Sequence, residues 1–441
     1  MACYSFQRTL YCFANSFLAT RRASNELISF ARPRTSYSSN VLFKNRFGRV
    51  CCSLSSGWCK VVRRVSSYGI STSAESATLA QDAIFDSADR GDGLANHSSS
   101  NGRVMLIDGT SIIYRAYYKL LAKLHHGHLS DADGNGDWVL TIFTALSLII
   151  DVLEFIPSHV AVIFDHNGVP YGHTSLSSKQ SYVAKGLNFR HTLFPSYKSN
   201  RPPTPDTIIQ GLQYLKASIK AMSIKVIEVP GVEADDVIGT LAVKSVNAGF
   251  KVRVVSPDKD FFQILSPSLR LLRIAPRGLE MVSFGMEDFA KKYGTLEPSQ
   301  FVDVMSLVGD KADNIPGVEG IGNVHAVQLI TKFGTLENLL QCVEQVDEER
   351  IRKVVNSYGE CLALTSNAEQ ALLSKNLAML RSDLPFYMVP FSTEDLTFMK
   401  PEDNGEKFTS LLTAISAYAE GFSPDTIIRK AFYLWKKLER Q

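Results

Sequence analysis

The sequence predicts an α/β protein with a mostly parallel central sheet and helices on both faces of that sheet. Three observations predict this fold class. Short apolar runs alternate with longer segments of helical periodicity, several of these runs end in an aspartate, and no apolar run is long enough to span a membrane. At 441 residues the chain suits two or three domains, and 45% apolar with 21% charged side chains excludes a disordered or collagen-like chain.

The first hundred residues differ in composition from the rest. Residues 1–100 hold 12 basic and 6 acidic side chains, and up to Ser73 the single acidic residue is Glu26. An Arg-rich, Ser-rich and acid-poor segment of weak amphipathic character is typical of an organellar transit peptide. We therefore expect residues 1–75 to direct the chain to a mitochondrion, a chloroplast or both, and residues 76–101 to form a linker. A disordered basic tail that binds nucleic acid is the alternative.

The cysteines and histidines argue against a zinc site or a disulfide framework. Only Cys342 and Cys361 lie beyond residue 100, as expected for a reducing compartment. His125, His126 and His128 have no matching partner ligand and are interpreted as part of a polar loop.

The elements follow one another in a βαβ order. Strands are predicted at 104–107, 160–164, 225–229 and 251–255, and helices at 111–124, 139–155, 206–222 (capped by Asp206) and from 233 onward. Residues 166–205 lack a clear period and predict a long excursion, whereas the chain after 286 is helical with glycine-rich breaks. We expect a core at 102–295 that includes this excursion, a helical region at 296–390 and a C-terminal extension at 391–441.

Three predicted strands end at an aspartate, namely Asp108, Asp165 and Asp258. Ligand sites of open parallel sheets form outside the carboxyl ends of the strands, so these carboxylates are expected at one rim. Further acids are Glu233, Asp235 and Asp236 at a predicted helix start, Asp260, and Asp310 and Asp313 on a glycine-bounded turn. Taken singly, each acid could instead cap a turn or provide charge at a helix N-terminus.

The size of the repulsion decides what an acidic cluster can do. Two carboxylates about 4 Å apart repel by roughly 1 kcal/mol in water and roughly 4 kcal/mol at an effective dielectric constant of 20. A cluster of eight or nine must therefore protonate, spread apart or bind cations. Oxygen ligands without Cys or His select Mg²⁺ or Mn²⁺, and two such ions about 4 Å apart can act on a phosphodiester.

Several longer segments together resemble the 5′-nucleases, specifically the 5′–3′ exonuclease domain of bacterial DNA polymerase I and its flap-endonuclease relatives. The segments are LIDGTSIIYRAYY, AVIFD, FRHTLFPSYKSNRPPTPD, GVEADDVIGTLA, VVSPDKDFFQIL, LVGDKADNIPGVEGIG and ALLSKNLAMLRSDLP, in the order of the family. The resemblance implies a PIN-like core followed by a helix–three-turn–helix region that binds DNA. No polymerase portion follows, so we expect a stand-alone nuclease of the plant organellar type.

Carried over position by position, the resemblance implies metal binding by nine acids. These are Asp108, Asp165, Glu233, Asp235, Asp236, Asp258, Asp260, Asp310 and Asp313. It further implies a two-metal hydrolysis with Mg²⁺, or with Mn²⁺ in its place, that leaves a 5′-phosphate and needs no Ser or Cys nucleophile.

Basic and aromatic residues alternate in the excursion after Asp165. Without the resemblance this segment would be interpreted as a solvated loop. The resemblance implies an arch for a single-stranded 5′ end, in which Lys198 meets the scissile phosphate, Arg201 contacts a nearby phosphate, and Arg190 and Tyr197 contact DNA. Arg115 matches a basic residue beside the first metal-binding aspartate.

Gly317, Gly320 and Gly322 precede a predicted helix at 323–333 and would let backbone amides approach a duplex phosphate. The chain departs from the family pattern in two places. Val324 and His325 stand where relatives have a basic residue and a threonine, which puts one duplex contact in question. Residues 169–188 lengthen the arch.

The sequence thus predicts a metal-dependent 5′–3′ exonuclease and flap-type endonuclease of organellar DNA replication or repair, which includes removal of RNA primers. Expected partners are 5′ flaps, nicked or gapped duplex and RNA–DNA hybrids, with a monomeric chain and no membrane. One alternative is a single-strand ribonuclease on the same acidic core. The other is a catalytically inert, structure-specific DNA-binding protein.

Overall fold

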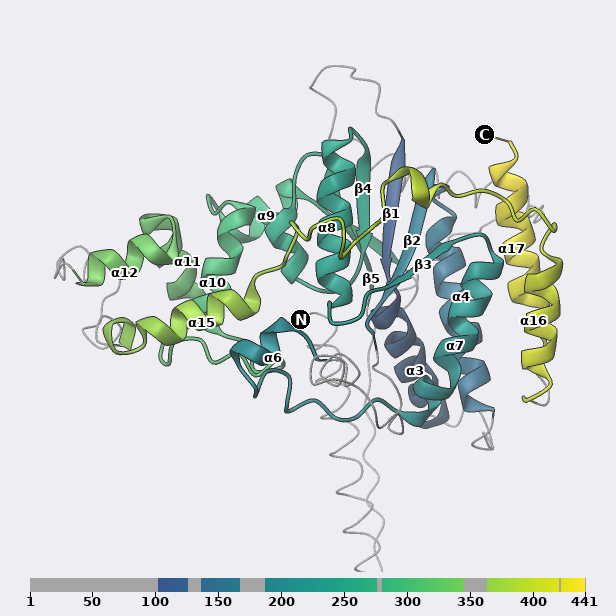
Figure 1. Ribbon diagram of the computed structural model, residues 1–441, viewed down its shortest axis with the longest axis horizontal. Coiled ribbons are helices and arrows are strands. Elements are labelled where there is room, and N and C mark those ends of the chain that lie inside the picture. The colour runs from purple at the N-terminus through teal and green to yellow at the C-terminus, as the bar shows by residue number, and fades with distance from the viewer. Residues whose placement is uncertain are drawn as a thin grey trace, which may run out of the picture. The chain divides into compact units, whose positions relative to one another are not determined.

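A six-stranded sheet forms the core of the chain in the computed structural model, which describes residues 102–125, 136–166, 187–275, 280–344, 363–419 and 422–440 (Figure 1). The strand order is β3-β2-β1-β4-β5-β6, and only β5 and β6 pair in antiparallel fashion. The strands are β1 (Arg103–Asp108), β2 (His159–Phe164), β3 (Lys225–Glu228), β4 (Lys251–Val255), β5 (Leu269–Ile274) and β6 (Met281–Phe284). The predicted fold class is confirmed.

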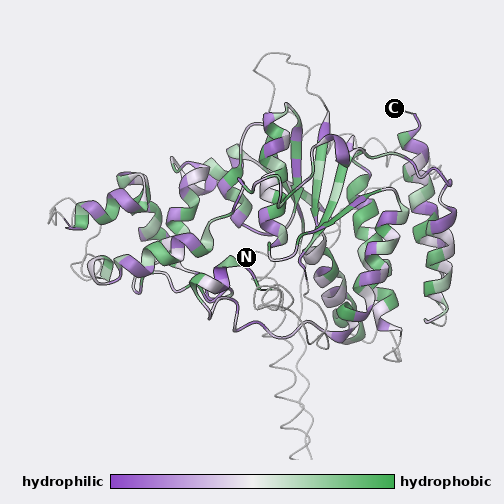
Figure 2. Ribbon diagram, viewed as in Figure 1, coloured by the Kyte–Doolittle hydropathy of each residue, from purple (hydrophilic) through white to green (hydrophobic). Residues whose placement is uncertain are grey.

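Strand β1 illustrates why the sheet is buried on both faces. Its residues from Val104 to Ile107 are at most 1% exposed. Val104 and Leu106 belong to the apolar cluster on one face of the sheet, and Met105 and Ile107 to the cluster on the other. Successive side chains of a strand point to opposite faces, so a strand covered on both sides needs a continuous apolar run. In Figure 2 the central strands are accordingly drawn mostly in the green of hydrophobic residues.

Helices cover both faces of the sheet (Figure 1). Helices α3, α4 and α7 pack together on one face, and α8 packs against β1 and β4 on the other. They are α3 (Gly109–His125), α4 (Asp137–Leu153), α7 (Asp206–Ala221) and α8 (Ala234–Asn247). The predicted helices are confirmed with small shifts at their ends. The capping role predicted for Asp206 is wrong, because the N-cap of α7 is Pro205 and Asp206 lies in its first turn.

The chain after β6 is helical, as predicted. Helix α10 packs against α11 and α15, and the buried carboxylate of Asp303 on α10 lies 2.6 Å from Lys375 Nζ on α15. The helices of this part are α9 (Met286–Tyr293), α10 (Phe301–Val308), α11 (Asn323–Phe333), α12 (Leu336–Glu344) and α15 (Ala368–Ala378), and α6 (Phe189–Leu193) precedes them in the excursion.

Two C-terminal helices, α16 (Glu406–Ser416) and α17 (Asp425–Leu438), add a further layer. Helix α17 packs against α4 and α16 packs against α7. Trp435, 1% exposed, joins the apolar cluster of that face, and Lys430 Nζ lies 2.6 Å from Asp151 Oδ1 on α4. The extension predicted at 391–441 is therefore part of the folded core.

Parts of the sequence prediction fall outside the described residues. These are the transit peptide and linker, His126, His128, Cys361 and residues 169–186 of the arch insertion. Cys342, which is described, forms no disulfide. Among the helices of the described ranges, none combines the length and the apolar character that a membrane crossing requires.

Candidate active site

The three strand-end aspartates follow neighbouring strands. Strand β1 lies between β2 and β4 and is parallel to both, with Ile107 in register with Val162 and Val255. Asp108 is the last residue of β1, Asp165 follows β2, and Asp258 comes three residues after β4. Because the carboxyl ends of parallel strands meet at one edge, the three side chains reach a common pocket.

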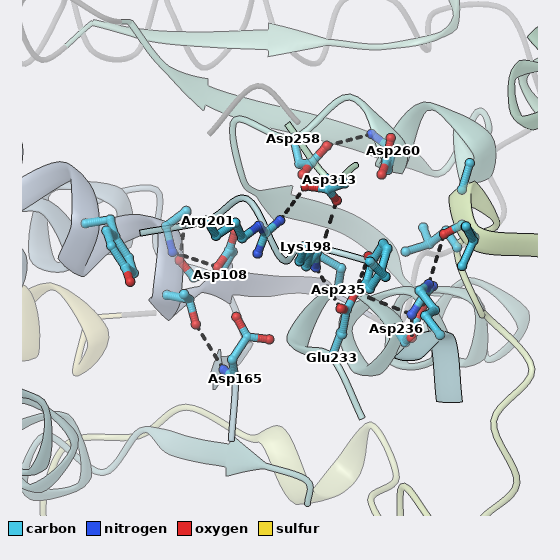
Figure 3. Close-up of a pocket in the computed structure, with 18 residues that line it drawn as sticks. Asp108, Asp165, Lys198, Arg201, Glu233, Asp235, Asp236, Asp258, Asp260 and Asp313 are labelled. Atoms are coloured by element: carbon cyan, nitrogen blue, oxygen red, sulfur yellow. Dashed lines mark hydrogen bonds and ion pairs between the residues drawn. The ribbon is translucent and has the colours of Figure 1, made fainter. Parts of the chain in front are cut away.

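One pocket at this edge collects eight of the nine predicted acids (Figure 3). Its acidic lining residues are Asp108, Asp165, Glu233, Asp235, Asp236, Asp258, Asp260 and Asp313. The ninth, Asp310, does not line the pocket, but the charge of Asp313 contributes to raising its pKa, after burial. Acids from positions that span two hundred residues are thus brought together.

Asp108 is fixed by hydrogen bonds at the start of α3. Its Oδ1 accepts the Ser111 backbone N–H at 2.8 Å, and its Oδ2 accepts the Ser256 hydroxyl at 2.9 Å. Burial raises the pKa of Asp108 to about 6 despite the hydrogen bond from Ser111, and the charge of Asp165 raises it further. Ionising Asp108 in this buried site therefore costs free energy, and a bound cation would offset that cost.

The N-terminus of α8 supplies three acids. Asp165, which follows β2, accepts the Ala234 N–H on its Oδ1 at 2.8 Å and so caps the N-terminus of α8. Glu233 is the N-cap residue, and Asp235 and Asp236 lie in the first turn, where the helix dipole favours negative charge. Burial, and then the charges of Asp108 and Asp258, hold the pKa of Asp235 well above its usual value.

Two turns carry the remaining acids. Asp258 Oδ1 accepts the Asp260 N–H at 2.9 Å, and Asp310 Oδ1 accepts the Ala312 N–H at 2.7 Å. Gly309 has a φ of +69°, and a Cβ there would lie 2.7 Å from the Gly317 nitrogen. The glycine is therefore required for the close approach that shapes this turn.

Two buried oxygens of these turns lack a hydrogen-bond partner within the described chain, namely Asp260 Oδ1 and Asp310 Oδ2. Burial and the neighbouring charge of Asp258 raise the pKa of Asp260 to about 8. A buried, unpaired carboxylate oxygen is costly unless it coordinates a cation.

Three basic side chains line the pocket with the acids, namely Arg190, Lys198 and Arg201. Lys198 Nζ is 2.6 Å from Glu233 Oε1 and 3.9 Å from Asp313 Oδ2, and Arg201 Nη2 is 2.5 Å from Asp313 Oδ1 (Figure 3). The Lys198 N–H also donates to the Asp313 carbonyl at 2.9 Å, with Lys198 at a φ of +56°. Burial would raise the pKa of Glu233, but the charges of Lys198 and then Arg190 hold it below its usual value.

The structure corrects the DNA contacts predicted for Arg190 and Tyr197, because both residues are only 3% exposed. Tyr197 donates its hydroxyl to Glu233 Oε2 at 3.3 Å, and Arg190 pairs with Asp236. Asp236 uses both oxygens for Arg190 and the Arg381 N–H, so in this arrangement it holds the chain together rather than facing a metal ion.

The other predicted residues lie outside the pocket lining. Arg115 donates to the carbonyls of Ile274 (3.3 Å) and Ala275 at the end of β5. Gly317, Gly320 and Gly322 belong to the turn before α11, where Gly320 and Gly322 have open space around them. Val324 is 69% exposed at this helix start, which leaves it accessible to a large ligand.

Sequence reasoning missed two polar side chains that hold the acids. Asn188 Nδ2 donates to Glu233 Oε1 at 2.7 Å, and the Ser256 hydroxyl holds Asp108. Ser256 directly follows β4, so its position at a strand end is the sequence feature that could have indicated its contact with Asp108. Asn188 precedes the FRHTL segment, and nothing in its sequence neighbours indicates a contact 45 positions away.

The donor set suits a hard divalent cation. Eight carboxylates line the pocket, and it contains no Cys or His among its lining residues. Over the described ranges no three acidic, His or Cys side chains already converge on one point where an ion could bind, and Lys198 and Arg201 are paired with Glu233 and Asp313. The residues therefore fit such an ion once these two cations release them.

Comparisons with known proteins agree with this architecture. A family model described as the 5′–3′ exonuclease N-terminal resolvase-like domain matches residues 103–294, and one described as the 5′–3′ exonuclease C-terminal SAM fold matches residues 296–404. A 5′–3′ exonuclease of Buchnera aphidicola is 31% identical over 292 residues, which cover 66% of this chain and 90% of the relative. The chain belongs to the 5′–3′ exonuclease family, and the predicted family and enzyme class, a nuclease, are confirmed.

The chain also resembles part of longer proteins. DNA polymerase I of Bacillus caldotenax is 35% identical over 297 residues, which are 67% of this chain and 29% of that polymerase. Among solved structures, a bacteriophage T5 flap endonuclease complex with DNA and metal ions has a TM-score of 0.47 at 19% identity and covers 71% of this chain and 99% of its own. The catalytic core of Rad2 with DNA substrate has a TM-score of 0.47 at 17% identity, with 76% and 93% covered.

Proposed function

We propose that this chain is a Mg²⁺-dependent 5′–3′ exonuclease and flap-type endonuclease that hydrolyses DNA phosphodiesters and leaves 5′-phosphates. The observation that carries the proposal is the single pocket in which eight carboxylates lie beside Lys198 and Arg201. A protein that only bound DNA phosphates would be weakened by such an excess of negative charge at its contact site, because carboxylates repel phosphates.

The acids of the pocket fall into two groups according to the elements that carry them. Asp108 ends β1, Asp165 follows β2 and Asp235 lies in α8. Asp258 and Asp260 follow β4, and Asp313 follows α10. The first group, joined by Glu233 when Lys198 releases it, would hold one Mg²⁺ ion, and the second group would hold another. When bound, such ions supply Lewis-acid polarisation of the phosphodiester and stabilise charge on its attacking and leaving oxygens.

The chain's own cations would orient the phosphate. Lys198 and Arg201 lie at the mouth of the pocket, paired to Glu233 and Asp313, with side chains 16% and 24% exposed. When the carboxylates bind metal instead, the ammonium and the guanidinium become available to the scissile phosphate and its neighbour. Asn188 and Tyr197 keep Glu233 in place during this exchange of partners.

We further propose that the turn at Gly317–Gly322 and the exposed start of α11 contact the duplex next to the cleaved strand. Open space at Gly320 and Gly322 supports a close approach of the backbone. Substrates are expected to be 5′ flaps, nicked or gapped duplex and RNA–DNA hybrids, bound by a monomer. The composition of residues 1–75 supports import into a mitochondrion or chloroplast, with a role in organellar replication or repair.

Cleavage of defined substrates tests the activity. We expect 5′-labelled flap DNA to be cut near the junction with Mg²⁺ and to remain intact in EDTA, while single-stranded RNA is cut far more slowly. Asp258→Ala is expected to abolish cleavage, whereas Asp288→Ala, an acid that faces Arg270 away from the pocket, should retain it. Equal activity in EDTA, or cleavage of RNA alone, would reject the proposal.

Targeting is tested separately. A fusion of residues 1–100 to a fluorescent protein is expected to accumulate in an organelle of plant cells. A fusion of residues 76–101 is the control and should remain in the cytosol. Cytosolic signal from the longer fusion would contradict the transit peptide without affecting the nuclease assignment.

A further inference from the structure

Arg190 is the most fully engaged charged side chain at the pocket. Its guanidinium donates from Nη1 and Nη2 to both oxygens of Asp236, at 2.7 and 2.9 Å, and from Nη1 to Glu233 Oε2 at 3.3 Å. Nε donates to the Leu377 carbonyl at 3.0 Å and Nη2 to the Met379 carbonyl at 2.7 Å. These contacts match the five N–H donors of the group, so none remains for DNA.

The carbonyls that Arg190 binds belong to a segment that we call the return segment, Leu377–Arg381. It consists of the last two residues of α15 and the three that follow, and it brings the chain back from the helical part to the acidic pocket, where Leu377, Ala378 and Leu380 line the wall. The return segment therefore belongs both to the helical part and to the wall of the candidate site.

Hydrogen bonds fix the backbone of every residue of the return segment. Besides the two carbonyls that Arg190 binds, the Gln263 side chain accepts from the Leu380 N–H and donates to the Ala378 carbonyl, both at 3.0 Å. The Arg381 N–H donates to Asp236 Oδ1 at 2.9 Å. A Cβ on Gly239 of α8 would lie only 2.9 Å from the Arg381 carbonyl, so the segment lies directly against that helix.

Glu233 is thereby tied to the same assembly. Arg190 and Tyr197 contact its Oε2, while Lys198 and Asn188 contact its Oε1. Displacing the guanidinium removes one of these partners, and it also frees Asp236 and two carbonyls that would be left buried without a partner.

We propose that Arg190 is a positioning residue of the nuclease: it joins the base of the arch, the start of α8 and the return segment, so that docking of the helical part sets the position of Glu233 in the pocket. The inference rests on the proposed nuclease function. It adds that the DNA-binding part and the acidic pocket are coupled through one buried guanidinium rather than through the DNA alone.

Hydrogen exchange tests the coupling in metal-free protein without DNA. Arg190→Lys keeps the positive charge but loses the planar guanidinium and its five donors. In this variant we expect the amide hydrogens of Leu380 and Arg381 to exchange at least about tenfold faster than in the unsubstituted chain. Arg270→Gln is the matched control, since Arg270 is also ion-paired but contacts Glu287 and Asp288 away from the pocket. Unchanged exchange in Arg190→Lys would refute the proposal.

Kinetics separate positioning from DNA contact. Arg190→Lys is expected to lower kcat on a flap substrate by about 100-fold, as a small misplacement of reacting groups does, while KM changes by less than about threefold. A raised KM with kcat and exchange unaltered would instead make Arg190 a DNA-binding residue and overturn the proposal.

Gln263→Ala provides a second approach that leaves Arg190 and all the acids intact. It removes both side-chain bonds to Ala378 and Leu380, so exchange of the return segment and kcat are expected to change together. Faster exchange at full kcat would contradict the coupling. Absence of cleavage by the unsubstituted chain would be a failure of the proposed function, which the exchange measurements distinguish from a failure of the coupling through Arg190.

Discussion

Lys198 Nζ lies 2.6 Å from Glu233 Oε1, an ion pair that joins the excursion after β2 to the start of α8. The pair lies within a pocket of carboxylates, and the φ of +56° at Lys198 is one that only a well-supported backbone maintains for a lysine. The backbone N–H of Lys198, bonded to the Asp313 carbonyl, provides part of that support. The side chain is thus held at the pocket mouth before any substrate arrives.

The first prediction concerns this lysine. Lys198→Ala should lower kcat on flap DNA by about 100-fold or more while the Kd for duplex DNA changes by less than about threefold, because the proposed role places the ammonium at the scissile phosphate and not on the duplex. The measurement is single-turnover cleavage together with fluorescence anisotropy of the same DNA in Ca²⁺.

Lys216 offers a matched control for that experiment. Its side chain is also 16% exposed, and it is also 2.6 Å from a glutamate, Glu228, but outside the pocket. Lys216→Ala should leave cleavage unchanged. Equal losses of kcat in the two variants, or a loss confined to duplex binding in Lys198→Ala, would remove Lys198 from the reaction.

The second prediction is a gain of stability at the expense of activity. Burial and Asp258 raise the pKa of Asp260 to about 8, so ionising Asp260 is less favourable in the folded than in the unfolded chain. Its contribution to the free energy of unfolding therefore becomes more unfavourable as the pH rises from about 4 to 8. Asp260→Asn should raise the free energy of unfolding in EDTA at pH 8 by more than about 1 kcal/mol, the equivalent of one pKa unit, and abolish Mg²⁺-dependent cleavage.

Denaturant titrations at pH 5 and pH 8 check this trade-off. The stabilisation should be larger at pH 8, and adding Mg²⁺ should raise the Tm of the unsubstituted chain more than that of Asp260→Asn. Asp288→Asn, at a half-exposed acid paired with Arg270, should show neither effect. A destabilised Asp260→Asn at pH 8 would mean that the carboxylate is already well compensated without metal.

Much of the core could be predicted because its signals are local. Continuous apolar runs that end in Asp108, Asp165 and Asp258 needed only adjacent residues and the geometry of parallel strands. Strands β5 and β6 were not predicted, since Arg270 and Arg273 interrupt the apolar run of β5 and β6 is four residues long with exposed Val282. These two strands lie at one edge of the sheet, and the local sequence pattern does not show that such segments pair there.

Arg190 shows why the rest of the site could not be predicted. An arginine between aromatic residues in a polar segment has the same sequence appearance whether it binds DNA or is buried. Its burial depends on Asp236, 46 positions later, and on two carbonyls 187 and 189 positions later. The two C-terminal helices have the same difficulty, because their apolar sides indicate a partner without indicating that α4 and α7 are that partner.

The third prediction tests the buried ion pair of the helical part. Asp303 and Lys375 have side chains that are 4% and 15% exposed and atoms 2.6 Å apart. Lys375→Met should lower the free energy of unfolding by about 3 kcal/mol, since it leaves a buried carboxylate unpaired. Lys400→Met, which breaks a more exposed 2.6 Å pair with Glu439, should cost less than about 1 kcal/mol. Similar losses in the two variants by denaturant titration would contradict the importance of burial here.

The fourth prediction uses the departure from the family at the start of α11. Val324 is 69% exposed next to glycines that have open space around them, yet it carries no charge for a phosphate. Val324→Lys should therefore tighten duplex binding, by about three- to tenfold in 0.1 M salt, and make the slope of log K against log salt more negative by about 1.

Val282→Lys, at a 47% exposed position on β6, adds the same charge elsewhere and should change the slope little. Because the charge is added far from the carboxylates, kcat should not change. An identical effect of both lysines would mean that the duplex does not contact α11.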